Sequence, residues 1–180
     1  MRQLLSILFF VAIANGAMAQ VLVAAYTRYD DSFGEWYFLT EDEEEGTLNL
    51  RWLFEENWTE WDYRLGELSG SIELKWKDSP EEWELRGGNH IVTARTVWPG
   101  DLKEWRINDG EHTLTLRSRW SNRLDEWELR SSHDGDWIMY TVYEGDPRDW
   151  VIDDRLPEEY PFETRLMLAF LVLYHASPKR

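Results

Sequence analysis

Apolar and polar residues alternate along most of the chain, in short runs separated by turn residues. In one run, Leu114, Leu116 and Trp120 share a face, and threonine and arginine occupy the other. A period of two is typical of a strand buried on one side only. Turn residues such as Asp30-Asp31-Ser32 and Pro99-Gly100-Asp101 separate neighbouring runs. The pattern predicts antiparallel hairpins with an apolar and a charged face.

A tryptophan recurs through these hairpins at a nearly fixed spacing. It occupies six positions: Trp36, Trp61, Trp83, Trp105, Trp127 and Trp150. Those from Trp61 to Trp127 are 22 residues apart. An acid directly precedes each one, and a second aromatic lies seven residues before it: Tyr29, Phe54, Trp76, Trp98, Trp120 and Tyr143. A fixed period indicates one supersecondary unit copied in tandem. We therefore predict six hairpins, with the acids facing outward.

Strict alternation also predicts which aromatic residues face the core. It places the recurring tryptophans inward. Trp76 and Trp120 of the second aromatic series, and Trp52 next to that series, are placed inward as well. Large aromatic side chains on the buried face fill a core efficiently. We therefore interpret the tryptophan repeat as core packing.

The first 19 residues do not follow the repeat. Arg2 precedes an apolar run from Leu4 to Ile13, and Ala17-Met18-Ala19 precedes Gln20. This order is typical of a secretory signal peptide with a small-residue cleavage site. We predict a signal peptide over residues 1–19 and an exported protein, periplasmic or extracellular. Because the chain has no cysteine, an exported fold must be held by its core.

The C-terminal part is apolar on every side. Leu166 to Tyr174 form an apolar run behind Pro161, which predicts a helix over about residues 161–175. The run is far shorter than the ~20 residues that span a bilayer. A helix that is apolar all round must be surrounded by protein. For residues 20–180 we predict one all-β domain with one C-terminal helix, a closed 12-stranded antiparallel barrel (hairpins 20–155) around that helix.

This order of elements resembles the tubby C-terminal-like fold shared with scramblases and LURP-one-related proteins. The segment Phe33-Gly34-Glu35-Trp36-Tyr37-Phe38 and the sequences around Trp127 and Trp150 are similar to hairpins of the LURP-one-related group. The resemblance covers nearly all of residues 20–180 and implies a barrel threaded by a hydrophobic helix. Family members associated with phosphoinositide headgroups use basic side chains, and this chain has no matching basic cluster.

The chain is strongly acidic, with 19 Lys+Arg, 35 Asp+Glu and a formal net charge of −16. Removal of a signal peptide containing Arg2 would change this charge to −17. Such a charge disfavours nucleic acid and anionic membrane surfaces, and favours cationic partners.

Several residues could in principle carry chemistry. His90, His112 and His133 occupy equivalent links between hairpins, about 9.6 Å apart at ~4.8 Å per strand, which is too far for shared metal ligation. The acidic run Glu41 to Glu45, with Asp30-Asp31, lacks the spacing of a calcium loop and is interpreted as a solvated, mobile loop. We predict no catalytic residue, no cofactor and no metal site.

The first and last hairpins lose the charge of their outward faces. Alternation places apolar residues there: Leu22, Ala24, Tyr26, Tyr37 and Leu39, and Ile138, Tyr140 and Val142. Contiguous exposed apolar surface marks a partner site. We therefore predict a non-catalytic binding module with a protein partner or self-association through Tyr26, Leu39, Ile138, Tyr140 and Val142. Alternatives are a carbohydrate-active protein, with sugar stacking on Trp58 or a glycosidase built on the acids, and an outer-membrane β-barrel.

Overall fold

The computed structural model describes residues 20–53, 57–130 and 135–179. Twelve strands and one helix follow one another along the chain. They are β1 (Leu22–Tyr29), β2 (Ser32–Thr40), β3 (Glu45–Trp52), β4 (Asn57–Leu65), β5 (Leu68–Trp76), β6 (Ser79–Gly87), β7 (His90–Thr96), β8 (Glu104–Asn108), β9 (Thr113–Ser118), β10 (Glu126–Leu129), β11 (Trp137–Thr141), β12 (Asp149–Asp154) and α1 (Phe162–Ala176).

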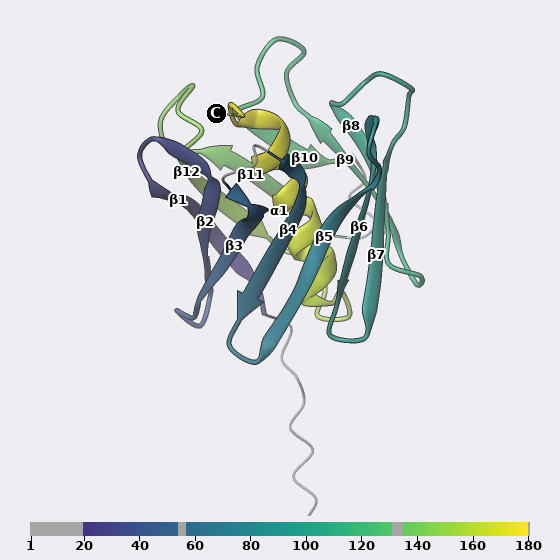
Figure 1. The fold of residues 1–180 in the computed structure, drawn as a ribbon. Coiled ribbons are helices and arrows are strands. Elements are labelled where there is room, and N and C mark those ends of the chain that lie inside the picture. Colours follow the sequence, from purple (N-terminus) through teal and green to yellow (C-terminus); the bar gives the residue numbers. More distant parts are fainter. Residues whose placement is uncertain (1–19, 54–56, 131–134, 180) are drawn as a thin grey trace, which may run out of the picture.

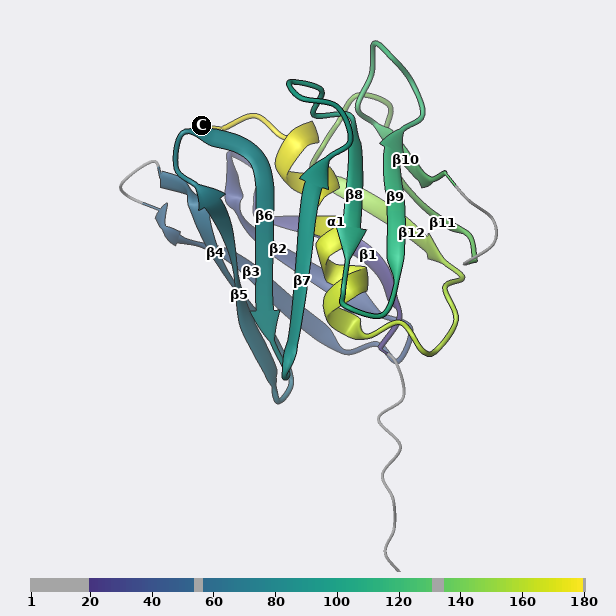
Figure 2. The ribbon, with the colours of Figure 1, turned by 90° about the vertical axis from the view of Figure 1, so that its right-hand side faces the viewer.

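The strands form a closed antiparallel barrel around the helix (Figure 1). Each strand pairs with its neighbours in sequence, and β1 pairs with β12 to close the ring. The predicted fold class, a closed 12-stranded barrel with one C-terminal helix, is confirmed. Hairpin turns lie at the end of the barrel near the C-terminus, which we call the tip end, and the links between hairpins lie at the base end (Figure 2).

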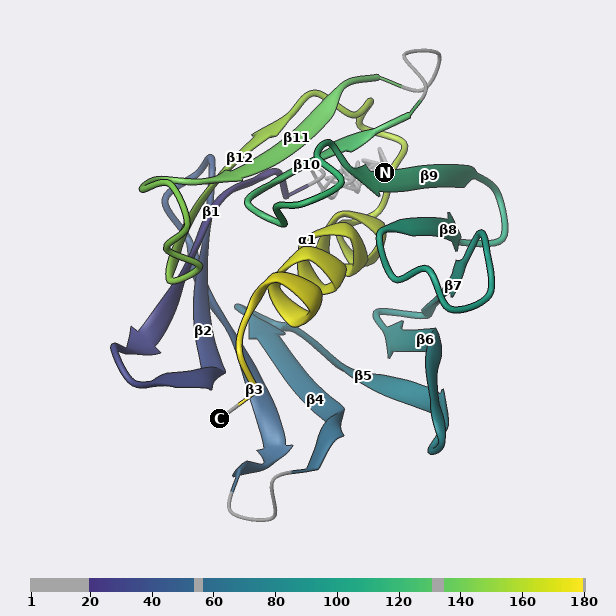
Figure 3. The same cartoon turned by 90° about the horizontal axis from the view of Figure 1, so that it is seen from above.

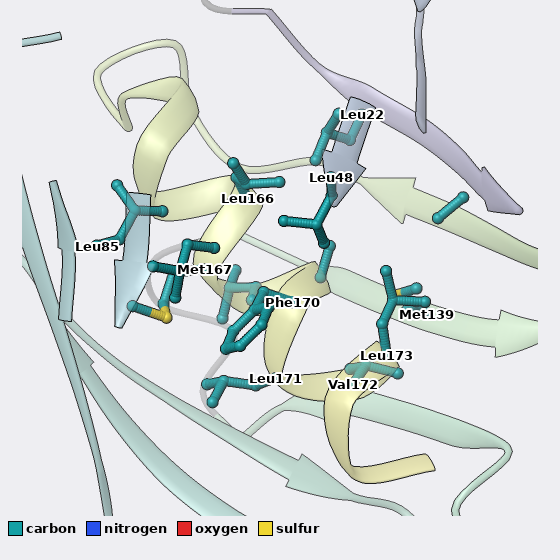
Figure 4. Close-up of a cluster of buried hydrophobic side chains, with 14 of the residues drawn as sticks. Leu22, Leu48, Leu85, Met139, Leu166, Met167, Phe170, Leu171, Val172 and Leu173 are labelled. Carbon is teal, nitrogen blue, oxygen red and sulfur yellow. The ribbon is translucent and has the colours of Figure 1, made fainter. Parts of the chain in front are cut away.

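Helix α1 is the centre of the core. It runs along the inside of the ring of strands in the view from above (Figure 3). Every side chain from Phe162 to Leu173 is buried, and Phe170 packs edge-on against Trp61 and Trp83. Leucines and methionines from the helix meet those of the strands in one cluster (Figure 4). The inward position of all six recurring tryptophans is confirmed, because each is at most 2% exposed.

The second aromatic series does not follow the predicted alternation. Trp52, Trp76 and Trp120 were expected inside, but they are exposed at the tip end. In the first three hairpins a register shift comes just before the aromatic, between Thr27 and Tyr29, Leu50 and Trp52, and Leu74 and Trp76. A bulge interrupts the alternation of sides. In the fifth hairpin β9 ends at Ser118, so Trp120 lies beyond the strand.

A register shift also explains why the prediction was wrong for one residue of the outward face. Leu22 was expected outside, but it is fully buried. The β1–β2 pairing shifts between Leu22 and Ala24, which places Leu22 and Ala25 in the core. Ala24 and Tyr26 remain half-buried on the outer side.

Candidate functional site

The inner tryptophans are fixed by hydrogen bonds to the tip turns. In five hairpins the indole N–H donates to the carbonyl oxygen three residues earlier, at 2.8–3.2 Å. These acceptors belong to Phe33, Trp58, Leu102, Leu124 and Pro147. A buried indole N–H needs such a partner. In these five hairpins the bond therefore fixes the inner tryptophan to the segment that follows the turn or forms its end.

In four hairpins the acid before the inner tryptophan accepts a hydrogen bond from an outer tryptophan. The indoles of Trp52, Trp76, Trp98 and Trp120 donate to Glu60, Glu82, Glu104 and Glu126 at 2.8–3.2 Å. Lys75 also donates to Glu82 at 2.6 Å. The hydrogen bonds from Lys75 and then Trp76 lower the pKa of Glu82. These acids lie on the outer side of the strands, as predicted, but they are partly buried and bound to neighbouring side chains rather than freely solvated.

These four tryptophans and two tyrosines form a set of exposed aromatic side chains at the tip end. We call them the rim aromatics: Tyr29, Trp52, Trp76, Trp98, Trp120 and Tyr143. Trp98 and Tyr143 are 61% and 66% exposed. Arg28 lies over Tyr29, Lys75 over Trp76, and both Arg119 and Arg123 over Trp120 at 5.2–5.9 Å from the ring centroids. The rim thus already accommodates cations on aromatic faces.

A cleft of about 1170 Å³ opens at the tip end, between the turns of the first, fifth and sixth hairpins and the end of α1. The views agree that the β11–β12 loop lies beside the end of β1 here (Figures 1 and 3). Its apolar wall includes Phe33, Leu124, Pro147 and Trp150. The cleft is large enough for a small-molecule ligand.

The polar lining of this cleft is unbalanced in charge. It contains five carboxylates, from Asp30, Asp31, Asp125, Glu144 and Asp146, and two guanidinium groups, from Arg123 and Arg148.

Part of that charge is paired within the cleft. Arg148 donates to Asp146 at 2.6 Å, and its hydrogen bonds lower the pKa of that carboxyl group. Arg123 pairs with Glu144 and lies 3.6 Å from Asp125. In the part of the chain that the structure describes, the side chains of Asp30 and Asp31 make no hydrogen bond or ion pair. The first turn therefore contributes two carboxylates without a direct ion pair to the cleft, of which Asp30 interacts with Arg148 at longer range.

Barrel closure brings the outward residues of the first and last hairpins together. In one row, Leu39 pairs with Ala24, Ala24 with Val151, and Val151 with Tyr140, so an apolar row crosses β2, β1, β12 and β11. We call the terminal-hairpin face this row together with the remaining outward residues: Tyr26, Tyr37, Ile138 and Val142.

Acids border the terminal-hairpin face. Glu45 pairs with Leu39, and Glu126 pairs with Tyr140. Tyr26 donates to Glu45 at 2.5 Å, and that hydrogen bond, followed by burial, raises the pKa of Tyr26 to about 12. Tyr140 and Val142 are 42% and 49% exposed. An apolar centre with a polar border is typical of interaction surfaces.

The remaining candidates are separated from one another. Trp58 is half-buried, with its ring 5.9 Å from that of Trp61, so it partly packs against the core. His90 is exposed at the start of β7. His112 contacts Asp109 at 3.2 Å and the Tyr160 ring at 4.3 Å, so the prediction of a solvated loop histidine was wrong for this residue. His133 lies outside the described residues.

The acidic run and Asp30-Asp31 lie at opposite ends of the barrel. Thr40 closes the turn over the run, because its hydroxyl accepts from the backbone N–H of Glu44 at 3.1 Å. Glu44 also accepts from Gln20 at 2.9 Å. Within residues 20–53, 57–130 and 135–179, no group of three or more His, Cys, Asp or Glu side chains could hold a metal ion.

The cleft was not predicted from the sequence. A signal for it was present, because the turns of the first and sixth hairpins are both acidic and closure makes those hairpins neighbours. Turn length and the position of the helix end could not be read from the repeat.

The structure is a helix-centred β-barrel with an open cleft at its tip end. The chain matches no family model, no curated protein and no solved structure. The resemblance to the tubby-like group therefore stays a prediction. In the part of the chain described, no helix is long and apolar enough to cross a membrane.

Proposed function

We propose that the protein is an exported, non-catalytic binding module that associates with a protein partner or a second copy through the terminal-hairpin face. The observation that carries the proposal is the apolar row from Leu39 to Tyr140, which crosses four neighbouring strands. Barrel stability does not require it, because the buried side of the same strands already packs on α1.

The middle hairpins provide the contrast. Their outward faces carry charged pairs, such as Glu82 opposite Arg95, and Arg117 opposite both Glu104 and Glu128. A lipid-facing surface would be apolar all the way round. These charges favour an aqueous module over an outer-membrane barrel.

The approach to the helix does not cover this face. Leu156 and Tyr160 are buried at the base end, and the backbone carbonyls of Leu156 and Pro157 accept from Arg165. Residues 1–19 lie outside the described residues, so the signal peptide and export remain parts of the proposal.

The test is the double substitution Tyr140→Lys and Val142→Lys. Both side chains are exposed, so we expect the unfolding midpoint to change little. Lysines buried at an interface cost several kcal/mol, so affinity for the partner should fall by at least about 100-fold. Sedimentation equilibrium measures self-association, and titration of the purified partner, first isolated from the exported fraction, measures binding.

Ile91→Lys is the matched control. Ile91 lies on β7, outside the terminal-hairpin face, and is 49% exposed, as is Val142. The control should bind like the parent. The proposal is lost if the double variant associates like the parent, or if it melts far lower while both proteins are monomeric at every concentration.

Carbohydrate binding is a second candidate, favoured by the exposed faces of the rim aromatics. Their indole N–H groups are occupied by the glutamates, so the flat faces are what a ligand would meet. Replacement of Trp98 by alanine should then weaken binding of a neutral oligosaccharide, measured by titration calorimetry. A glycosidase built on these glutamates is disfavoured, since all four hold indoles.

A further inference from the structure

The lining of the tip-end cleft is rich in acidic side chains. Its five carboxylates face two guanidinium groups, which leaves a formal excess of three negative charges. Asp30 and Asp31 form the β1–β2 turn. The residues on either side of them, Tyr29 and Ser32, pair with each other. Asp30 is close enough to Arg148 to add, after Asp146, to the raised pKa of that guanidinium group.

The C-terminal end of α1 borders the cleft, and Lys179 donates to the carbonyl oxygen of Tyr174 there at 2.8 Å. Ala176 and Pro178 line the cleft, so the C-terminal end of α1 is directed toward it. The C-terminus of a helix carries a partial negative charge and favours cations. The excess of carboxylates in the lining therefore disfavours an anionic ligand.

Three rim aromatics are close in sequence to residues that line the cleft. Tyr29, Trp120 and Tyr143 belong to the three hairpins whose turns form it. Arg28 lies 5.2 Å from the centre of the Tyr29 ring, and Arg123 lies 5.3 Å from that of Trp120. A basic residue, Arg28 or Arg119, directly precedes the rim aromatic in the first and fifth hairpins. In the sixth hairpin Val142 is at this position, directly before Tyr143. Among the described residues, no cation lies over Tyr143, although its ring is 66% exposed.

We propose that the tip-end cleft binds an organic cation that carries primary ammonium or guanidinium groups. One charge pairs with Asp30 and Asp31, and another lies over the face of Tyr143. The apolar wall formed by Phe33, Leu124 and Trp150 contacts the aliphatic part of the ligand. This site is distinct from the terminal-hairpin face and does not depend on its function.

Two probes separate the sources of such a cation. Spermidine represents a free polyamine, and tetra-arginine represents a basic peptide segment. Titration calorimetry on the full folded domain at 150 mM NaCl should give one saturable site for at least one of them. Salt at this concentration screens exposed charges beyond about 8 Å, so general attraction to an acidic chain is suppressed.

Matched variants locate the site. Asp30→Asn with Asp31→Asn should weaken binding at least about fivefold, since each exposed ion pair contributes modestly. Glu158→Gln with Glu159→Gln removes the same charge at the base end, where α1 begins, and should leave the affinity unchanged (Figure 1). Tyr143→Ala should weaken binding about two- to fivefold through the lost cation–π contact. Trp98→Ala, at the equivalent position of another hairpin, should not.

Four results would overturn the proposal. The first is an equal loss of affinity in the Asp30/Asp31 and Glu158/Glu159 variants, and the second is competition by Mg²⁺ at equal ionic strength. The third is that neither probe binds. The fourth is that neutral cellotetraose binds more tightly than both probes, with an affinity that the Asp30 and Asp31 substitutions leave unchanged. The last result would assign the cleft to carbohydrate. None of these results would alter association through the terminal-hairpin face, so the two proposals fail separately.

Discussion

At the scale of single residues, the repeat provides hydrogen-bond acceptors for most of the indole N–H groups. Each inner tryptophan except Trp83 donates to a turn carbonyl, and each rim tryptophan donates to a glutamate. Within the described residues, the buried indole nitrogen of Trp83 has no hydrogen-bond partner. An unsatisfied buried donor costs free energy. The indole nitrogen of Trp137, at the start of β11, is buried without a partner in the described residues as well, so the third and sixth hairpins each contain a local weakness.

His175 is a second residue whose environment has a measurable consequence. Its ring stacks on Trp105 at 4.9 Å, and Tyr174 packs edge-on against it at 4.9 Å. Burial, aided by Lys179, lowers the pKa of His175 from 6.5 to about 3. The side chain is therefore neutral in the folded protein at ordinary pH.

This lowered pKa predicts acid sensitivity. The unfolded chain binds a proton on His175 below about pH 6.5, whereas the folded protein does so only near pH 3. Stability from this group should fall by about 2 kcal/mol between pH 7 and pH 5. His175→Phe preserves an aromatic ring and removes the titration. Urea unfolding of both proteins at several pH values should show a shallower pH dependence for the variant. Equal slopes would contradict the buried, neutral histidine.

The inward aromatic series could be predicted from the sequence because alternation and period gave the same face. The outward position of Trp52 and Trp76 could not, because a bulge of one residue reverses the side without changing the sequence pattern. His175 was also missed, since its burial depends on how far α1 extends past the strands.

At the scale of elements, α1 is fixed at its beginning by a buried ion pair. Arg165 donates to Asp154 at 2.5 Å, and both side chains are fully buried. The same guanidinium group donates to the carbonyl oxygens of Tyr160, Leu156 and Pro157 at 2.7–3.3 Å. Burial raises the pKa of Asp154, and Arg165 acts in the opposite direction. The pair joins the last strand to the helix.

The substitution Arg165→Met tests this link. It leaves Asp154 buried without a partner, which should cost about 3–5 kcal/mol of unfolding free energy. The double substitution Asp154→Leu with Arg165→Met removes both charges and should be less destabilised than the single variant. Chemical denaturation measures both values. The single substitution Asp154→Leu completes the comparison. If the double variant is destabilised by the sum of the two single values, the two residues act independently.

The existence of the helix and of the hairpins was predictable, because each has a long, regular pattern. The ion pair was not, because Asp154 and Arg165 belong to different elements whose packing angle the sequence does not give. Their charged side chains also look like ordinary surface residues in the printed sequence.

At the scale of the whole molecule, the ring of strands and the helix depend on each other. The inner faces of all six hairpins converge on α1, whose buried residues complete one continuous core (Figure 4). Close packing of this kind leaves no space that solvent could fill without loss of contacts. Closure was predictable because twelve half-apolar strands and a fully apolar helix have few other arrangements. The tip-end cleft was not, because turns of different length and direction form it.

Deletion of residues 162–180 is the most direct test of this dependence. The remaining chain keeps every strand but loses Phe162 to Leu173, all of which are buried against them. The exposed interior should bind the dye ANS strongly, and the near-UV circular dichroism of the tryptophans should collapse, because their packing partners are absent. Deletion of residues 177–180 alone is the control, since it leaves α1 intact, and it should retain the parent spectrum. If the longer deletion stays monomeric with an unchanged spectrum, α1 is peripheral, and the assignment of the core to the helix must be abandoned.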